Sequence, residues 1–260
     1  MNIVNTHSTS NEQTVNLAQA KLAETPIAIC INGISQAVMM ASPTDLEDFA
    51  VGFVIGEGLI ERASDVKSIS ITHLPQGIEV GLTVLARTEH RIKSKRRQLS
   101  GSTGCGLCGV DSIETAMTLP VLTPSTQQPP NHETIEQARQ ALTNIQKNHG
   151  CIQGHHSAVY FDINGQFIAI REDVGRHSAL DKLIGHIHRQ EIKSSTIDSP
   201  CGGFLLMTSR CSHDLVIKAA RGKLNVLITL AQPTNLAVAS AQSIGLTLFS
   251  FVHGKLQQFS

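Results

Sequence analysis

The amino-acid sequence predicts an α/β protein on three patterns. Apolar runs typical of strands alternate with segments of helical spacing through residues 131–252. Two Asn-Gly pairs, Asn32-Gly33 and Asn164-Gly165, each separate two apolar runs, as the tight turn of a β-hairpin does. A chain of 260 residues is long enough for one large domain or two small ones. The alternation in the second half favours a largely parallel sheet with helices on both faces.

The first half is expected to hold a hairpin, one helix and two further strands. Thr44 and Glu47 have the spacing of a capping box, so a helix is expected to begin there and to end near Gly56 or Gly58. The strands are expected at 27–31, 35–40, 68–72 and 77–85.

The second half is expected to alternate helix and strand. Gly222 and Gly245 follow two of the helical segments and are expected to stop them. The helices are expected at 131–147, 178–192, 213–221 and 235–244. A hairpin is expected over 158–170, and strands at 204–207, 225–229 and 246–252. The proline-rich residues 120–130 form a linker, so the predicted division is a loose polar tail at 1–20, a small α+β domain at 21–100, a cysteine-containing loop and linker at 101–130 and an α/β domain at 131–260.

Composition excludes several classes of function. Lys plus Arg is 21 and Asp plus Glu is 21, which argues against a basic nucleic-acid binder. Trp is absent and there is one Tyr, so a base-stacking platform is not expected. No run approaches the roughly 20 apolar residues of a membrane span, and the polar start lacks the pattern of a secretory signal. We expect a cytoplasmic protein that binds neither membrane nor nucleic acid.

The pair Cys105 and Cys108 is the most informative motif. Two intervening residues let both sulfurs face the same way, and four glycines lie within the same ten residues. Three chemistries use such a pair: half of a zinc site, a dithiol redox couple, or sulfur carriage as a persulfide. The alternative is that both cysteines are small apolar residues without a chemical role, which the flanking glycines disfavour.

Motifs that are absent from the sequence argue against some of these three chemistries. A second C-x-x-C is absent, so zinc would need scattered ligands. No His or Cys is followed two residues later by Glu, and Gly104 precedes Cys105, which excludes the zinc deaminase signature. A glycine-rich arm suits a sulfur that visits a donor and then an acceptor. The basic residues at 87–97 either lower the thiol pKa or form a solvated strand edge, with about equal weight.

Three further segments are candidate sites. Residues 171–182 carry many charges at the predicted start of a helix, with Asp173 placed to cap it, although a capped helix with surface ion pairs is slightly favoured. Residues 208–210 lie between a strand and a helix, where α/β folds present groups to ligands. Residues 251–256 follow the last predicted strand, and a frayed terminus is the alternative there. No phosphate-binding or dinucleotide-binding glycine motif is present.

Taken together, the motifs at 44–53, 57–60, 104–109, 172–182 and 233–238 resemble the FdhD family of formate dehydrogenase accessory sulfurtransferases. The match runs in order from about residue 20 to the C-terminus. The resemblance implies a cytidine-deaminase-like, three-layer fold for the larger domain, without zinc chemistry. It also implies a cytoplasmic homodimer. Two departures concern the expected pocket: Ile152-Gln153 and Thr208-Ser209 replace residues usual in the family.

The resemblance also implies a function and its residues. Such a protein takes sulfur from a cysteine desulfurase as a persulfide and hands it to molybdenum bis(molybdopterin guanine dinucleotide), a bound substrate, for formate dehydrogenase. By motif position, Cys105 carries the persulfide and Cys108 assists or resolves it. The cofactor-binding residues would be Phe251, Val252, His253, Gly254, Lys255 and Leu256. Two alternatives stay open: a cofactor-binding chaperone without sulfur transfer, and a zinc-binding structural module.

Overall fold

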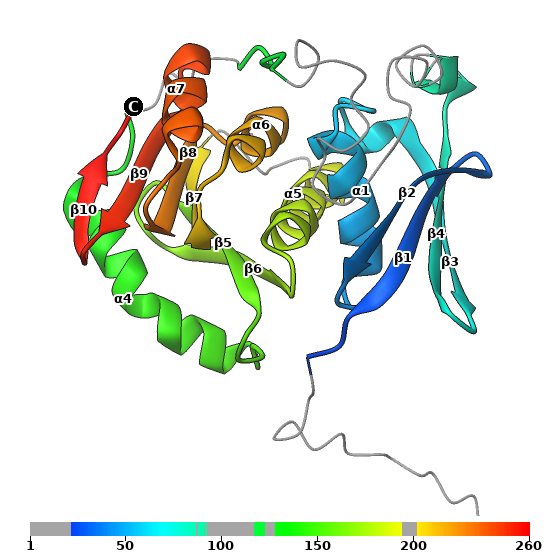
Figure 1. Cartoon of the computed structure of the whole chain (residues 1–260), viewed down its shortest axis with the longest axis horizontal. Helices are drawn as coiled ribbons and strands as arrows, with labels where there is room; N and C mark the ends of the chain where they lie inside the picture. Colours follow the sequence, from blue (N-terminus) through cyan, green and yellow to red (C-terminus); the bar gives the residue numbers. More distant parts are fainter. Residues whose placement is uncertain (1–21, 87, 91, 93–116, 123–127, 194–201) are drawn as a thin grey trace, which may run out of the picture.

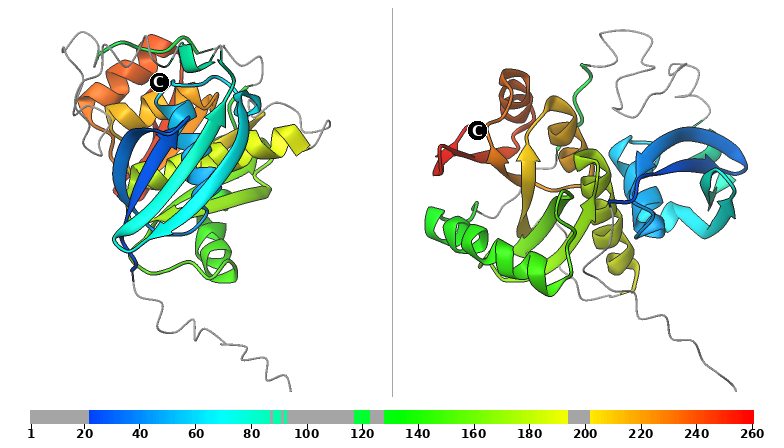
Figure 2. Two further views of the ribbon diagram at one scale, coloured as in Figure 1. Left: turned by 90° about the vertical axis from the view of Figure 1, so that its right-hand side faces the viewer. Right: turned by 60° about the horizontal axis from the view of Figure 1, so that its bottom comes forward.

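The computed structural model describes residues 22–86, 88–90, 92, 117–122, 128–193 and 202–260. Two β-sheets and the helices between and outside them form successive layers (Figure 1). A four-stranded sheet packs on helix α1 (Leu46–Gly56), which packs on α5 (Arg176–Lys193) of the larger part. A six-stranded sheet follows, and α4 (His132–Asn148) covers its far face. The right-hand view of Figure 2 shows α1 between the smaller sheet and α5.

The four-stranded sheet has the order β2-β1-β4-β3. Strands β1 and β4 are parallel, and the other two pairs are antiparallel. The predicted Asn-Gly hairpin is present, with φ of 46° at Asn32 and 77° at Gly33, the positive values that this turn requires. The strands are β1 (Thr25–Ile31), β2 (Ile34–Ala41), β3 (Val66–Leu74) and β4 (Gly77–Val84), with a short 3₁₀ helix, η2 (Ala63–Asp65), before β3.

The helices α1 and α5 cross with their backbones in contact. A Cβ atom added at Gly52 would lie 1.6 Å from the carbonyl oxygen of Asp181, and one at Gly185 would lie 1.8 Å from that of Asp48. The predicted capping box of Thr44 and Glu47 at the start of α1 is not formed. The helix begins one residue after Asp45, which is left-handed at φ 51°, and no side chain caps it. The hydroxyl of Thr44 instead accepts a hydrogen bond from Lys182.

The six-stranded sheet has the order β10-β9-β8-β7-β5-β6. The predicted largely parallel sheet is wrong in part: β7, β8 and β9 are parallel to one another, whereas β5/β6, β5/β7 and β9/β10 are antiparallel. The last strand was not predicted. The strands are β5 (His156–Asp162), β6 (Phe167–Asp173), β7 (Gly203–Arg210), β8 (Val226–Ala231), β9 (Thr247–Val252) and β10 (Lys255–Gln258).

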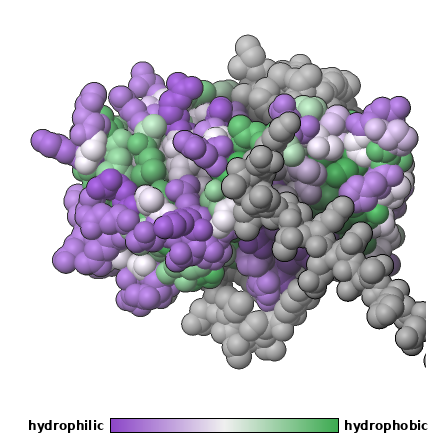
Figure 3. Space-filling view, turned by 90° about the horizontal axis from the view of Figure 1, so that it is seen from below, coloured by the Kyte–Doolittle hydropathy of each residue, from purple (hydrophilic) through white to green (hydrophobic). Residues whose placement is uncertain are grey.

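Each face of this sheet has its own apolar core, as the two-residue period of a strand requires. Tyr160 and Leu205 belong to the core shared with α5, α6 (His213–Arg221) and α7 (Asn235–Ile244). Their neighbours Phe161 and Phe204 stack at 5.2 Å in the core under α4. Seen from below, the left half of the molecule, where α4 lies, is mostly hydrophilic (Figure 3). This arrangement confirms helices on both faces of the sheet.

The mixed α/β class is therefore confirmed. The likeness to cytidine deaminases and the residue limits of the predicted domains stay predictions. Within the part of the chain that the structure describes, no helix has the length and apolar character needed to cross a membrane.

Candidate functional site

One edge of the six-stranded sheet gathers the polar segments that the sequence singled out. Strands β6, β7, β8 and β9 run in the same direction, because β5 is antiparallel to both of its neighbours. Their carboxyl ends therefore meet at one edge, together with the start of β5. The chain turns there into α5, α6 and α7 and into the β9–β10 hairpin. Crevices at such an edge are the usual ligand sites of open α/β sheets.

A buried ion pair joins this edge to the smaller sheet. The Nζ atom of Lys182 lies 2.7 Å from Oδ2 of Asp173, and both side chains are 0% exposed. The backbone N–H of Ser42 donates to the same carboxylate oxygen at 2.9 Å. Lys182 also donates to the carbonyl of Ser42 at 3.0 Å and to the hydroxyl of Thr44 at 3.2 Å. For residues 171–182, the sequence slightly favoured ion pairs on the surface. That prediction is wrong for Asp173 and Lys182, because this pair is inside the protein.

A second set of hydrogen bonds extends from that pair to the start of β5. The hydroxyl of Ser157 donates to Oε1 of Glu172 at 2.9 Å. His155, immediately before β5, shares a 3.1 Å hydrogen bond between its Nε2 and the hydroxyl of Ser42. The backbone N–H of Ser157 donates to Oγ1 of Thr208 at 2.9 Å. Thr208, one of the family departures, thus positions the strand that carries Ser157.

Two carboxylates share the ammonium group of Lys218. Its Nζ lies 2.8 Å from Oε1 of Glu57 and 2.9 Å from Oδ1 of Asp181. Burial lowers the pKa of Lys218, but the two carboxylates outweigh burial and raise that pKa, so the lysine is charged. Burial raises the pKa of Asp181 to about 7, against the effect of Lys218. Burial also acts to raise the pKa of Glu57, but Lys218 brings it below its usual value. Burial and the Lys218 ammonium thus act in opposite directions on the Asp181 carboxyl, whose two oxygens both accept hydrogen bonds from that ammonium.

Beside this cluster lie two buried polar atoms without a partner. Nε2 of His177 and Oγ of Ser212 have no hydrogen bond among the described residues. Burial, together with the nearby Lys218 ammonium, lowers the pKa of His177 to about 4, so its imidazole is neutral at pH 7. The nearest carboxylate, that of Asp214, is 3.8 Å away, and burial raises its pKa. Unpartnered buried groups next to titratable residues with shifted pKa values are typical of functional sites.

Arg171, at the start of the charged segment, has a structural role. Its Nη2 and Nε atoms donate to Oδ2 of Asp48 on α1 at 2.7 Å and 2.9 Å. Burial raises the pKa of Asp48, but hydrogen bonds from His186 and Arg171 outweigh burial and bring it to about 2. Arg189 pairs with the same carboxylate. These contacts hold α1 against α5 and so support the site from behind.

The predicted sulfur-carrying residues Cys105 and Cys108 lie outside the described residues, as do most of the basic residues before them. The cysteines within the described residues do not resemble reactive thiols. Burial raises the pKa of Cys211 to about 12, and burial together with Glu172 raises that of Cys151. Cys30 is buried. Among the described residues, no group of three or more His, Cys, Asp or Glu side chains is arranged to hold a metal ion.

The predicted cofactor-binding residues lie in the β9–β10 hairpin, which forms the two outermost strands on one side of the six-stranded sheet (Figure 1). Phe251 faces the core under α4, with the guanidinium of Arg139 5.1 Å from the centre of its ring. His253 and Gly254 have positive φ values of 50° and 75° and form the exposed turn. The turn lies at the same sheet edge as His177 and Ser212, so the structure brings this segment and the charged segment to one side of the fold.

Sequence reasoning missed Glu57, Lys218, Asp214 and Ser212 as site residues. Lys218 carried a signal, because it lies on the buried side of α6 among residues such as Leu215 and Ala219, where an apolar side chain is expected. Glu57 lay within a family-like motif but had no partner that the sequence could identify.

The amino-acid sequence and the fold were compared with those of known proteins. The model of the FdhD/NarQ family matches residues 22–259. The sulfur carrier protein FdhD of Cupriavidus necator is 41% identical over 233 residues, covering 88% of this chain and 77% of that protein. The protein of the same name from Acinetobacter baylyi is 38% identical, with 88% and 81% covered. A crystal structure from Desulfotalea psychrophila, assigned as a formate dehydrogenase accessory protein, superposes with a TM-score of 0.67 at 24% identity and supports the fold. It covers 91% of this chain and 87% of its own.

Proposed function

Because the chain belongs to the FdhD/NarQ family, we propose that it is a sulfur carrier for formate dehydrogenase. It accepts sulfur from a cysteine desulfurase as a persulfide and passes it to molybdenum bis(molybdopterin guanine dinucleotide), its bound substrate, before that cofactor enters the dehydrogenase. The name of the relatives, sulfur carrier protein FdhD, supports the sulfur role. The proposal includes a cytoplasmic homodimer, a cytidine-deaminase-like larger domain and the sulfurtransferase activity itself.

The loading step is a thiol exchange at Cys105. Its thiolate attacks the outer sulfur of the persulfide on the donor, and a new sulfur–sulfur bond forms at Cys105. The bond between the two sulfurs of the donor breaks, and the donor cysteine leaves as a thiolate. No electrons are gained or lost overall, so this step needs no other reagent.

The delivery step uses Cys108. Its thiolate attacks the inner sulfur of the Cys105 persulfide, forms a Cys105–Cys108 disulfide and releases the outer sulfur as sulfide at the metal. The two thiols supply the two electrons that reduce the sulfur. A dithiol reductant must then reopen the disulfide before the next cycle. The C-x-x-C spacing therefore fits a carrier that delivers sulfide, which a single cysteine would not do alone.

The candidate site supplies a place for the anionic cofactor. His177 is neutral at pH 7, and its Nε2 and the hydroxyl of Ser212 have no partner among the described residues. They lie at the starts of α5 and α6, where backbone N–H groups favour a negative ligand. The β9–β10 turn is at the same edge. We propose that the guanine dinucleotide part of the cofactor binds along this edge, with residues 251–256 contributing.

The observation that carries the proposal is the intact Cys105–Cys108 motif within a family match covering residues 22–259. The test is maturation of formate dehydrogenase in cells that depend on this chain. Cys105→Ala is expected to abolish formate dehydrogenase activity while the protein accumulates normally. Cys30→Ala, a buried cysteine of the smaller sheet, is the matched control and is expected to leave activity unchanged. Normal activity with Cys105→Ala would overturn the proposal.

A further inference from the structure

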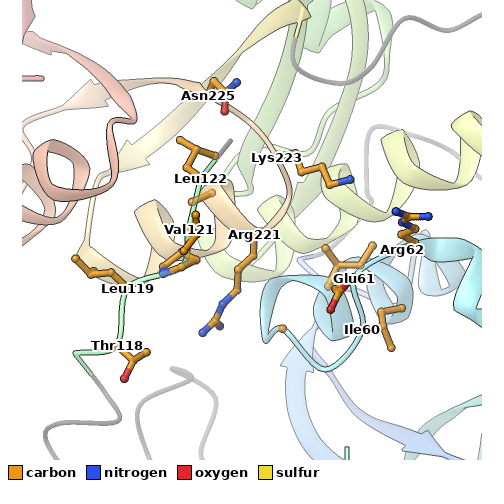
Figure 4. A pocket seen from close by; sticks show the side chains of 14 residues that line it. Ile60, Glu61, Arg62, Thr118, Leu119, Val121, Leu122, Arg221, Lys223 and Asn225 are labelled. Carbon is orange, nitrogen blue, oxygen red and sulfur yellow. The ribbon is translucent and has the colours of Figure 1, made fainter. Parts of the chain in front are cut away.

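A pocket of about 680 Å³ lies away from the site described above. It is bounded by the end of α1 and the loop after it, by the end of α6, and by residues 118–122 (Figure 4). Asn225, which lines it, immediately precedes β8, so the pocket is at the amino end of that strand and the candidate site is at the carboxyl end. The volume is in the range that binds small ligands.

Three cations line this pocket. Arg62 and Lys223 are exposed at its rim, and Arg221 donates from Nη1 to the carbonyl of Gly56 at 2.9 Å. Lys223 has φ of 59°, a backbone conformation that a residue other than glycine adopts at a cost. The chain thus places a long cationic side chain where glycine would be easier to accommodate. Glu61 is the one acidic residue among the described lining residues, so the pocket favours an anion.

The amide of Asn225 points to a more specific ligand. Asn225 is 6% exposed, and neither Nδ2 nor Oδ1 has a hydrogen-bond partner among the described residues. An unpartnered buried amide costs stability, because it has given up its hydrogen bonds to water. A partner that offers one acceptor and one donor side by side would satisfy both atoms. A peptide group has this pair.

The wall at 118–122 is suited to a peptide as well. This segment has no helix or strand, and the backbone of Leu119, Val121 and Leu122 makes no hydrogen bond with any other residue the structure describes. Leu119 and Leu122 from this segment, with Ile55 of α1 and Ile60 of the loop after it, are apolar residues that line the pocket. A segment with available backbone groups beside an apolar wall can pair with the backbone of a bound peptide.

We propose that this pocket binds a carboxylate adjacent to a peptide amide. Arg62 and Lys223 pair with the carboxylate, the Asn225 amide pairs with the peptide group, and the apolar wall takes the side chain. Two sources supply this chemistry: the C-terminal end of a partner protein and a small free peptide. The inference does not depend on the proposed sulfur chemistry.

The test is calorimetric titration of the full-length protein with defined probes. These are N-acetyl-Ala-Leu as the free acid, the same dipeptide with its C-terminus amidated, and a ten-residue peptide ending in Ala-Leu with a free carboxylate. The free acid is expected to bind at least tenfold more tightly than the amidated form. A further tenfold gain for the longer peptide identifies a protein chain end, and equal affinity identifies a small free peptide.

Three variants assign the binding to this pocket. Asn225→Leu is expected to weaken binding at least tenfold while the midpoint of thermal unfolding is unchanged or higher, because an unpartnered amide is removed. Lys223→Gly is expected to weaken binding and to keep the fold, since glycine accepts the positive φ. Lys147→Ala, on the last turn of α4, is the control and should leave affinity unchanged.

Three results would overturn the proposal. They are absence of binding by the free acids, equal binding of the free and amidated dipeptides, and unchanged affinity in Asn225→Leu. A lower unfolding midpoint in Asn225→Leu with full binding would identify that residue as structural. Binding of inorganic phosphate or GMP in the absence of any peptide binding would overturn the proposal in favour of another class of anion.

Discussion

The buried pair of Asp173 and Lys182 predicts a measurable coupling energy. Both side chains are 0% exposed and their charged atoms are 2.7 Å apart. Removing one partner of such a pair costs about 3–5 kcal/mol, because the other charge stays buried without compensation. In Lys182→Met the carboxylate keeps its hydrogen bonds from the N–H groups of Ser42 and Gly175. We therefore expect the lower end of the range, about 3 kcal/mol.

The reciprocal variant and the double variant complete the cycle. Asp173→Asn leaves Lys182 with three oxygen acceptors, including the carbonyl of Glu172, so about 3 kcal/mol is expected again. The double variant leaves no buried charge, and its loss is expected to fall short of the sum of the single losses by about 2 kcal/mol. A total stability of about 5–15 kcal/mol allows all three variants to fold.

Urea unfolding followed by far-ultraviolet circular dichroism measures these free energies, since the chain has no Trp for fluorescence. Wild type and the three variants are compared at pH 7 and at constant ionic strength. Losses below about 1 kcal/mol in both single variants, or additive losses in the double variant, would refute the reasoning that this pair is buried and mutually dependent.

Two further predictions concern the helix crossing and the titration of the site. Gly52→Ala is expected to destabilise the protein by more than about 3 kcal/mol or to prevent folding, because its Cβ would lie 1.6 Å from a backbone oxygen. Gly245→Ala, with positive φ and open space, is the control and should cost about 1 kcal/mol; similar losses would contradict the close crossing. His177 has a folded pKa of about 4, below its usual value, so the unfolded chain takes up the proton first and the stability from neutral His177 is lost as pH falls from about 6.5 towards 4. Relative to His177→Gln, the wild type is therefore expected to lose about 2 kcal/mol between pH 7 and pH 5 in urea unfolding, and parallel pH profiles would contradict a buried neutral imidazole.

Local signals in the sequence predicted the helices of the larger part well. Helices α6 and α7 have the predicted limits because Gly222 and Gly245 follow them directly and the apolar spacing is unambiguous. The start of α1 was predicted one residue too early, with Thr44 as the capping residue instead of Asp45. The hydroxyl of Thr44 accepts a hydrogen bond from Lys182, a residue 138 positions away. Such a contact is not visible in a local motif.

The same reason limits what the sequence showed of the site. It identified residues 171–182 as charged and placed them at a helix start, but it favoured surface ion pairs. Asp173 and Lys182 are buried, and both bond to Ser42 of the smaller part, which is 131 positions away from Asp173 in the chain. The pairing of Glu57 with Lys218 likewise joins the two parts of the molecule. The chemistry of Cys105, by contrast, was inferred from its motif and family alone.

Transfer of labelled sulfur tests the central claim most directly. Purified protein is incubated with a cysteine desulfurase and ³⁵S-cysteine, separated from the donor, and assayed for label that cyanide releases. The account predicts one cyanide-labile sulfur per chain in the wild type and in Cys108→Ala, and none in Cys105→Ala. Equal labelling of Cys105→Ala, or an unlabelled wild type, would contradict it.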